Sequence, residues 1–154
     1  MSAHSYRALL HWDGSTADGI RTYSREHTAL APPAGQELRL SADPAFRGSP
    51  ELLNPEQLVV MAASSCQLLS FLAVAARAGV DVLGYDDEAT SRLDLTADPA
   101  RLTAIRLNVT VRTAAGTDTA RIQALAAQAH RECYIANSLS VPVEVTTTHE
   151  SAPG

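Results

Sequence analysis

The segment LLNPEQLVVMAASSCQLLSFLAVAARAG, Leu52–Gly79, is the longest apolar run of the chain and has the signals of one long helix. Asn54 can act as the N-cap, Pro55 suits the first helical position, and the Glu56 carboxylate is favoured in the first turn by the helix dipole. A basic residue in the last turn, Arg77, is followed by a glycine that can end the helix. We predict a helix of about 24 residues, roughly 36 Å long at 1.5 Å per residue.

This predicted helix is apolar on nearly every side. Its large apolar side chains are Leu58, Val59, Met61, Leu68, Leu69, Phe71, Leu72 and Val74. Such a helix is central and buried, or it lies in an interface between subunits. Glutamines and serines interrupt the run, which argues against a membrane span.

Shorter elements surround the long helix on both sides. Three mixed-polarity runs separated by Gly, Pro and Asp predict strands before it. Alternation predicts two strands after it, then an apolar stripe at helical spacing predicts a second helix, and a last strand follows. The ranges are 6–12, 20–30 and 36–42 before the helix, and 80–97, 102–113, 114–139 and 141–149 after it. The predicted order is βββ-α-ββ-α-β, an α+β fold in a single domain over residues 1–154.

Composition limits the classes of function. The chain has 154 residues, of which 45% are hydrophobic, and a net charge of -5. These values predict a soluble globular protein, and the acidic balance argues against nucleic acid as a partner. The N-terminal segment carries no secretory signal pattern, so we expect a cytoplasmic protein with no membrane partner. All twelve basic residues are Arg, so chemistry that needs a lysine is excluded.

The two cysteines, Cys66 and Cys133, are the residues most open to a chemical role. In a reducing compartment they are free thiols or a redox pair that opens and closes. Each falls within a predicted helix, where an unpaired cysteine more often packs as a small apolar side chain. Their separation fits no zinc motif, and the five histidines form no cluster of ligand spacing, so no metal or cofactor is expected.

Two segments together resemble the OsmC/Ohr family of osmotically inducible and organic-hydroperoxide-resistance proteins. They are NPEQLVVMAASSCQLLSFLAVAARAGV, followed by a Tyr-Asp pair, and AHRECYIANSLSVPVEV. The likeness covers about Trp12 to Val145, and the predicted order of elements agrees with it. The resemblance implies an OsmC-like fold in an intertwined homodimer, and a thiol-dependent peroxidase that reduces organic or fatty-acid hydroperoxides.

The resemblance also implies roles for single residues. Cys66 matches the peroxidatic cysteine, which is oxidised to a sulfenic acid, and Cys133 matches the resolving cysteine, which forms a disulfide with it. An external dithiol of the lipoyl-protein or thioredoxin type would then reduce the disulfide. Glu56 matches a glutamate that holds an activating arginine. No arginine aligns cleanly with the family position; Arg47 and Arg25 are the candidates, with Arg21 behind them.

Helix geometry places a condition on this scheme. Glu56 and Cys66 are ten residues apart, about 15 Å along one helix, so we predict that Glu56 and its arginine act on the thiols of the other subunit. Two alternatives stay open: a dimeric binding module for an apolar ligand with inert thiols, and a cysteine hydrolase. The hydrolase would need an orienting histidine that the sequence does not place.

Overall fold

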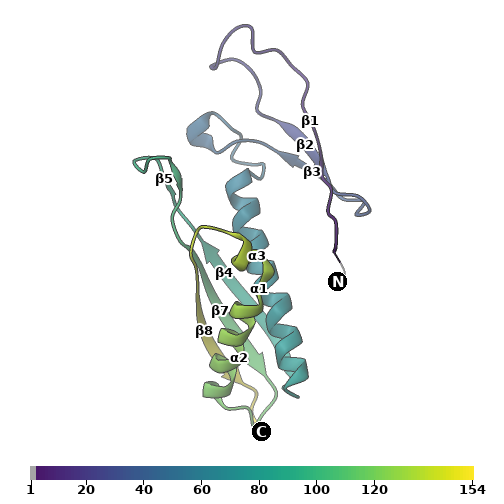
Figure 1. The fold of residues 1–154 in the computed structure, drawn as a ribbon, viewed down its shortest axis with the longest axis vertical. Helices are drawn as coiled ribbons and strands as arrows, with labels where there is room; N and C mark the ends of the chain where they lie inside the picture. The colour runs from purple at the N-terminus through teal and green to yellow at the C-terminus, as the bar shows by residue number, and fades with distance from the viewer. Residues whose placement is uncertain (1–2) are drawn as a thin grey trace. The chain divides into compact units, whose positions relative to one another are not determined.

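The long apolar segment forms one helix, α1 (Pro55–Arg77), in the computed structural model of the protein, which describes residues 3–154 (Figure 1). The predicted start is confirmed. The backbone N–H of Gln57 donates to Asn54 Oδ1 at 2.9 Å, and the backbone N–H of Asn54 donates to Gln57 Oε1 at 3.0 Å. This reciprocal capping pair satisfies two backbone donors at the start of the helix. Gly79, with φ +69°, ends it.

The chain forms two compact units, one that ends at Leu58 and one that begins at Val59. The boundary therefore falls inside α1 and not in a flexible linker. The single domain over residues 1–154 stays a prediction.

The first unit contains an antiparallel sheet in the order β1-β2-β3. Its strands are β1 (Leu9–His11), β2 (His27–Leu30) and β3 (Glu37–Leu40), followed by a short 3₁₀ helix, η1 (Pro44–Phe46). The prediction of a strand over residues 20–30 was wrong for its first seven residues, which lie in turns and a loop. The loop is held by side chains that bond to its own carbonyl groups, as when Trp12 Nε1 donates to Ser24 O at 2.8 Å.

The second unit contains a three-stranded sheet in the order β4-β7-β8. The β4 strand (Val82–Thr90) pairs antiparallel with β7 (Ile105–Thr113), and β7 pairs parallel with β8 (Val143–Ser151). Between β4 and β7 the chain adds a small pair, β5 (Leu93–Asp94) and β6 (Arg101–Leu102), around the turn predicted at residues 98–99. With this addition, the predicted order and the α+β class are confirmed.

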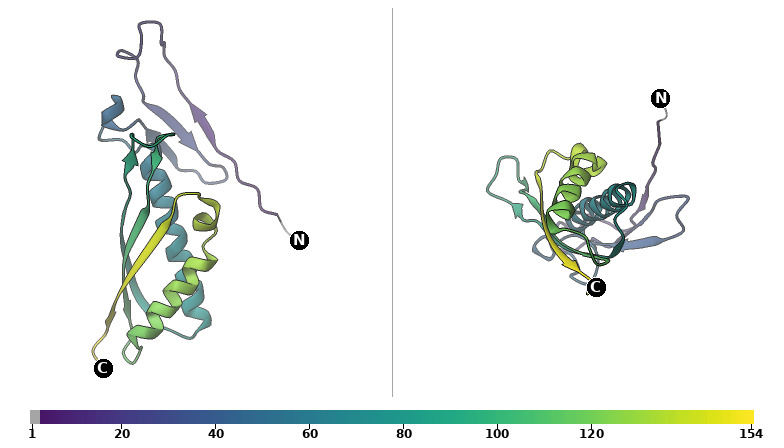
Figure 2. Two further views of the ribbon diagram at one scale, coloured as in Figure 1. Left: turned by 60° about the vertical axis from the view of Figure 1, so that its left-hand side comes forward. Right: turned by 90° about the horizontal axis from the view of Figure 1, so that it is seen from below.

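α1 and the second helix, α2 (Thr119–Glu132), lie side by side over one face of this sheet (Figures 1 and 2). The alternation predicted for β7 is confirmed, because its inward side chains are all buried: Ile105, Leu107, Val109 and Val111. They pack with Phe71 and Val74 of α1 and with Ile122 and Leu125 of α2. Burying these side chains is the main source of stability in this unit.

The α1 helix is only partly covered in the single chain. Met61 is 52% exposed, Leu69 64% and Leu72 39%, although these are large apolar side chains. Among the described residues, α1 is the one helix long and apolar enough to cross a membrane, a property that core helices of soluble proteins share. The part of the prediction that α1 is buried within its own chain therefore holds for one side of the helix only.

The second predicted helix is divided at Cys133. α2 ends at Glu132, Cys133 has extended backbone angles (φ -74°, ψ 109°), and a short helix, α3 (Tyr134–Ser138), begins after it. The sequence predicted one helix because the apolar stripe continues across this point. The break occurs where Cys133 Sγ accepts the Ala136 N–H at 3.5 Å and so caps the new helix.

Candidate active site

The two thiols meet between α1 and the α2–α3 junction. Cys66 comes from the middle of α1, and Cys133 from the break between α2 and α3. Both are free, and the Cys66 side chain is among the groups that raise the pKa of the Cys133 thiol. The two cysteines thus come from neighbouring elements of the core, and their pairing in a disulfide stays a prediction.

Their surroundings differ. Cys133 is 1% exposed, whereas Cys66 is half-buried. Burial raises the pKa of the Cys133 thiol, and the Cys66 side chain raises it further, while the Ala136 N–H lowers it. Cys133 is therefore the thiol that is held protonated, and Cys66 is the thiol that solvent and small molecules can reach.

A cleft of about 500 Å³ opens over Cys66. Leu69 and Ala73 of α1 line it beside the thiol, and Tyr134 of α3 lies across from them. Two arginines also line it: Arg77, whose guanidinium pairs with Glu132 at 2.8 Å, and Arg131. The cleft thus combines an apolar wall with positive charge.

Sequence reasoning missed these two arginines. Arg77 follows Cys66 by eleven residues, which is close to three helical turns and puts both side chains on one face of α1. Arg131 precedes Cys133 by two residues. Both spacings can be read from the sequence, but the predicted candidates for the activating cation all lie before α1.

A second missed feature is a group of buried polar side chains against α1. Ser64 Oγ donates to Asp87 Oδ2 at 2.5 Å, and Tyr85 stands on the same face of β4 as Asp87. Tyr85 Oη and Asp87 Oδ1 are both buried and have no hydrogen-bond partner among the described residues. Burial raises the pKa of Tyr85 strongly, and the charges of Asp87 and Cys133 raise it further.

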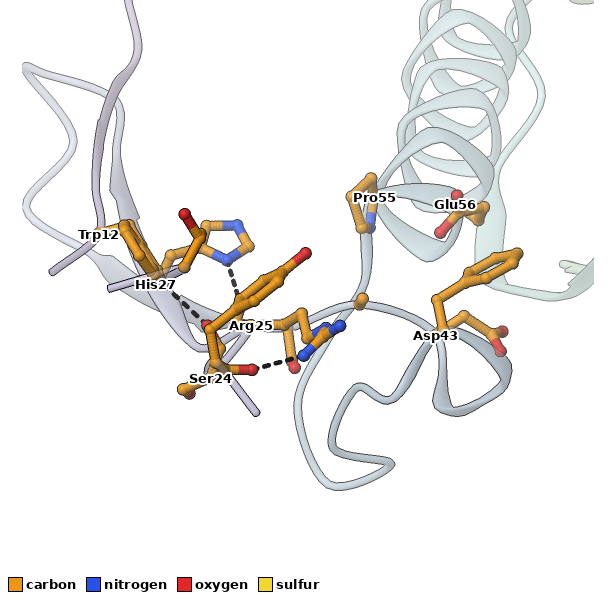
Figure 3. Close-up of a pocket in the computed structure, with 12 residues that line it drawn as sticks. Trp12, Ser24, Arg25, His27, Asp43, Pro55 and Glu56 are labelled. Carbon is orange, nitrogen blue, oxygen red and sulfur yellow. Dashed lines mark hydrogen bonds between the residues drawn. The ribbon is translucent and has the colours of Figure 1, made fainter. Parts of the chain in front are cut away.

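The other predicted site residues lie in the first unit, and two of them, Glu56 and Arg25, line a cavity of about 390 Å³ (Figure 3). Glu56 lines it from the first turn of α1, and Arg25 from the segment before β2. Trp12, Tyr23 and Phe46 make much of its wall apolar. Arg25 and Glu56 are thus brought to one cavity, although no ion pair joins them among the described residues.

Local contacts hold Arg25 in place. Its guanidinium lies 3.9 Å from the centre of the Tyr23 ring and donates to the carbonyl groups of Tyr23 and Ile20. The His27 Nδ1–H donates to the Arg25 carbonyl at 2.8 Å. Arg47, the other candidate, is exposed, has a left-handed backbone (φ 67°) at the end of η1, and does not line this cavity.

Family comparison agrees with this arrangement of elements. The family model described as OsmC-like protein matches residues 48–148, about two-thirds of the chain. The chain belongs to the OsmC-like family. Its matched segment includes both thiols, Glu56, the whole of α1 and most of the second sheet.

Solved structures of this OsmC-like fold extend the match over nearly the full chain. An OsmC-like protein of unknown function from Vibrio cholerae is similar with a TM-score of 0.84 and 26% identity, over 95% of this chain and 100% of that one. An organic hydroperoxide resistance protein OsmC from Legionella pneumophila has a TM-score of 0.73 and 18% identity, over 97% and 99%.

A third structure is a putative organic hydroperoxide resistance protein from Vibrio cholerae with captopril bound in one of its active sites. It has a TM-score of 0.71 and 20% identity, over 97% of this chain and 93% of that one. No protein of curated function matches the chain. Within residues 3–154, no three His, Cys, Asp or Glu side chains gather as a metal site.

Proposed function

We propose that this OsmC-like protein is a thiol peroxidase that reduces organic hydroperoxides. The observation that carries the proposal is the pair of free thiols on neighbouring elements of the core, one half-buried in a cleft and one buried. A sulfenic acid avoids irreversible oxidation when a second thiol is close enough to condense with it. The arrangement of Cys66 and Cys133 meets this need.

The proposed cycle has three steps. The Cys66 thiolate attacks one peroxide oxygen, the O–O bond breaks, and the alcohol leaves with a proton, so that Cys66 becomes a sulfenic acid. The Cys133 sulfur then attacks the Cys66 sulfur, the S–O bond breaks, and water leaves as the disulfide forms. An external dithiol, of the lipoyl-protein or thioredoxin type, returns two electrons and two protons to the pair.

The cleft over Cys66 supports an organic substrate. Leu69 and Ala73 offer apolar contact beside the thiol. Hydrogen peroxide gains little from such a wall and loses hydration on entering it, whereas an alkyl or aryl hydroperoxide buries its apolar part there.

We propose Glu56 and Arg25 as the pair that activates the thiol of a second subunit. Their shared cavity favours Arg25 over Arg47. A cation near a thiol stabilises the thiolate, which is the reactive form. The exposed apolar side chains of α1 support a homodimer as the working unit, because a second copy would cover them.

Mass spectrometry tests the proposed function directly. One equivalent of cumene hydroperoxide added to the reduced protein should remove two hydrogens and join Cys66 to Cys133, and Cys66→Ser should remove the reaction. Two unreacted thiols in the wild-type protein would contradict the proposal. That result would leave a binding module for an apolar ligand, which the largely apolar cavity around Trp12, Tyr23 and Phe46 favours.

A further inference from the structure

The proposed cycle does not yet assign a group that accepts the proton of Cys133. Cys133 must lose its proton when it attacks the oxidised Cys66, yet it is buried and is held protonated by its surroundings. A buried thiol that reacts needs a group that can take its proton. Two candidate groups lie on β4.

Asp87 is a half-buried carboxylate of β4 that is bonded to α1. One of its oxygens accepts the Ser64 hydroxyl at 2.5 Å, and Ser64 stands two residues before Cys66 on α1. The other oxygen, Oδ1, is buried and has no partner among the described residues. A buried carboxylate oxygen without a donor is rare in proteins, and this one belongs to a side chain bonded to α1 two residues from Cys66.

Tyr85 stands two residues before Asp87 on the same face of β4. Its ring packs against Phe71 of α1 with centroids 5.7 Å apart, which fixes the side chain against the helix that carries Cys66. Its hydroxyl is also buried without a partner among the described residues. Burial raises the pKa of Tyr85, and the negative charges of Asp87 and Cys133 raise it further. The two unpartnered polar atoms thus belong to neighbouring side chains on one face of β4.

We propose that Tyr85 and Asp87 form a proton path that takes the proton of the Cys133 thiol as this thiol closes the disulfide. This inference rests on the proposed function. Cys133 Sγ–H gives its proton through a bridging water to Tyr85 Oη, while Tyr85 gives its own through a second water to Asp87 Oδ1. The Cys133 sulfur then forms the S–S bond, the S–O bond of the Cys66 sulfenic acid breaks, and the proton held at Asp87 leaves with the hydroxide as water.

The path accounts for both unpartnered atoms and for the Ser64 contact. Ser64 occupies one oxygen of Asp87 and leaves the other without a donor among the described residues. Few other charged or titratable groups compete for the proton. On the elements packed around Cys133, they are Cys66 and Arg77 on α1, Tyr85 and Asp87 on β4, His130, Arg131 and Glu132 on α2, and Tyr134 on α3; the buried face of β7 contributes none. His130 Nδ1 is also buried without a partner among the described residues.

The test separates the two chemical steps. Reduced wild-type, Tyr85→Phe and Asp87→Asn proteins are mixed with one equivalent of cumene hydroperoxide, with dimedone present to trap sulfenic acid, and quenched samples are weighed by mass spectrometry. Loss of the first Cys66 thiol should proceed at the wild-type rate in all three. Disulfide formation should be about a hundredfold slower in the two variants at about pH 7, with dimedone on Cys66 instead.

The pH profile distinguishes a proton path from a packing effect. At about pH 10 Cys133 ionises more readily without help, so the variants should approach the wild-type rate of disulfide formation. Tyr6→Phe and Asp86→Asn are matched controls, because Tyr6 is 94% exposed and Asp86 is an exposed residue paired with Arg112. Both should behave as wild type.

Two results would overturn the inference. One is disulfide formation at the wild-type rate in Tyr85→Phe and Asp87→Asn at about pH 7; the other is a slowing that is the same at both pH values. If the wild-type protein itself keeps two free thiols, the proposed peroxidase fails and the inference fails with it. Because Tyr85→Phe removes one oxygen and Asp87→Asn is nearly isosteric, circular dichroism should show the wild-type fold for both.

Discussion

At the residue scale, the two cysteines are alike in sequence and different in structure. Each follows an apolar helical pattern, so the sequence alone could not say which of them is reachable. The difference arises from the positions of the two residues in the fold. Cys133 lies at the break between two helices and is buried in the core, whereas Cys66 lies on the side of α1 that faces a cleft. Only tertiary packing decides exposure at such positions.

The burial of Cys133 predicts a pH dependence of stability. Burial raises the pKa of its thiol above the ordinary value of 9.0, so the folded protein holds this proton more tightly than the unfolded chain does. The resulting stabilisation is complete below about pH 9 and is lost as the pH rises through the raised pKa. Removing the thiol removes this dependence.

Urea unfolding under reducing conditions measures the effect. Between about pH 8 and pH 10, the free energy of unfolding should fall more steeply in the wild-type protein than in Cys133→Ala. Higher pH is avoided, because burial also raises the pKa of Tyr85 above its ordinary value of 10.0. Parallel curves for the two proteins would contradict the assignment.

At the element scale, α1 was the most predictable part of the molecule. Its cap, proline and terminal glycine are local signals, and local signals are what a sequence shows directly. The strands β7 and β8 were also predictable, since one face of each is buried and the pattern alternates. The turns over residues 20–26 and the break at Cys133 were not, because both depend on side chains that bond to nearby backbone groups and replace the expected strand or helix.

The capping pair predicts a measurable contribution from Asn54. Asn54→Ala removes the acceptor for the Gln57 N–H and should cost about 1 kcal/mol. For a chain of this size, that corresponds to a fall in Tm of about 3 °C. Thermal unfolding followed by circular dichroism measures it, and Asn54→Asp, which keeps an oxygen acceptor, is the control that should stay close to wild type. An unchanged Tm in Asn54→Ala would show that the cap adds nothing.

At the scale of the whole molecule, α1 carries residues of both candidate cavities. It carries Glu56 in its first turn, at the cavity with Arg25, and Cys66 near its middle, beside Cys133. The sequence showed the ten-residue interval, from which we predicted that a second subunit takes part, but it could not show which arginine shares a cavity with Glu56. That assignment depends on the fold of the loop between β1 and β2, which has no regular pattern.

The proposed dimer predicts that two inactive chains can restore each other. Glu56→Gln lacks the residue that holds the activating arginine, and Cys66→Ser lacks the reacting thiol, so each alone should be inactive toward cumene hydroperoxide. In a mixed dimer, the Cys66 thiol of the first variant meets an intact Glu56 from the second. One of the two symmetric sites is then complete, and purified heterodimers should recover about half of the wild-type activity.

Differently tagged chains, refolded together and purified through both tags, provide the heterodimer, and sedimentation confirms that it is dimeric. A mixed dimer of Glu56→Gln with the double variant Glu56→Gln/Cys66→Ser is the matched control, because it has no intact Glu56 and should stay inactive. No recovery in a confirmed heterodimer would contradict the prediction that Glu56 acts on the Cys66 thiol of the other subunit. A stable folded monomer of the wild-type chain would contradict the dimer itself, because the exposed apolar side chains of α1 would then remain in contact with water.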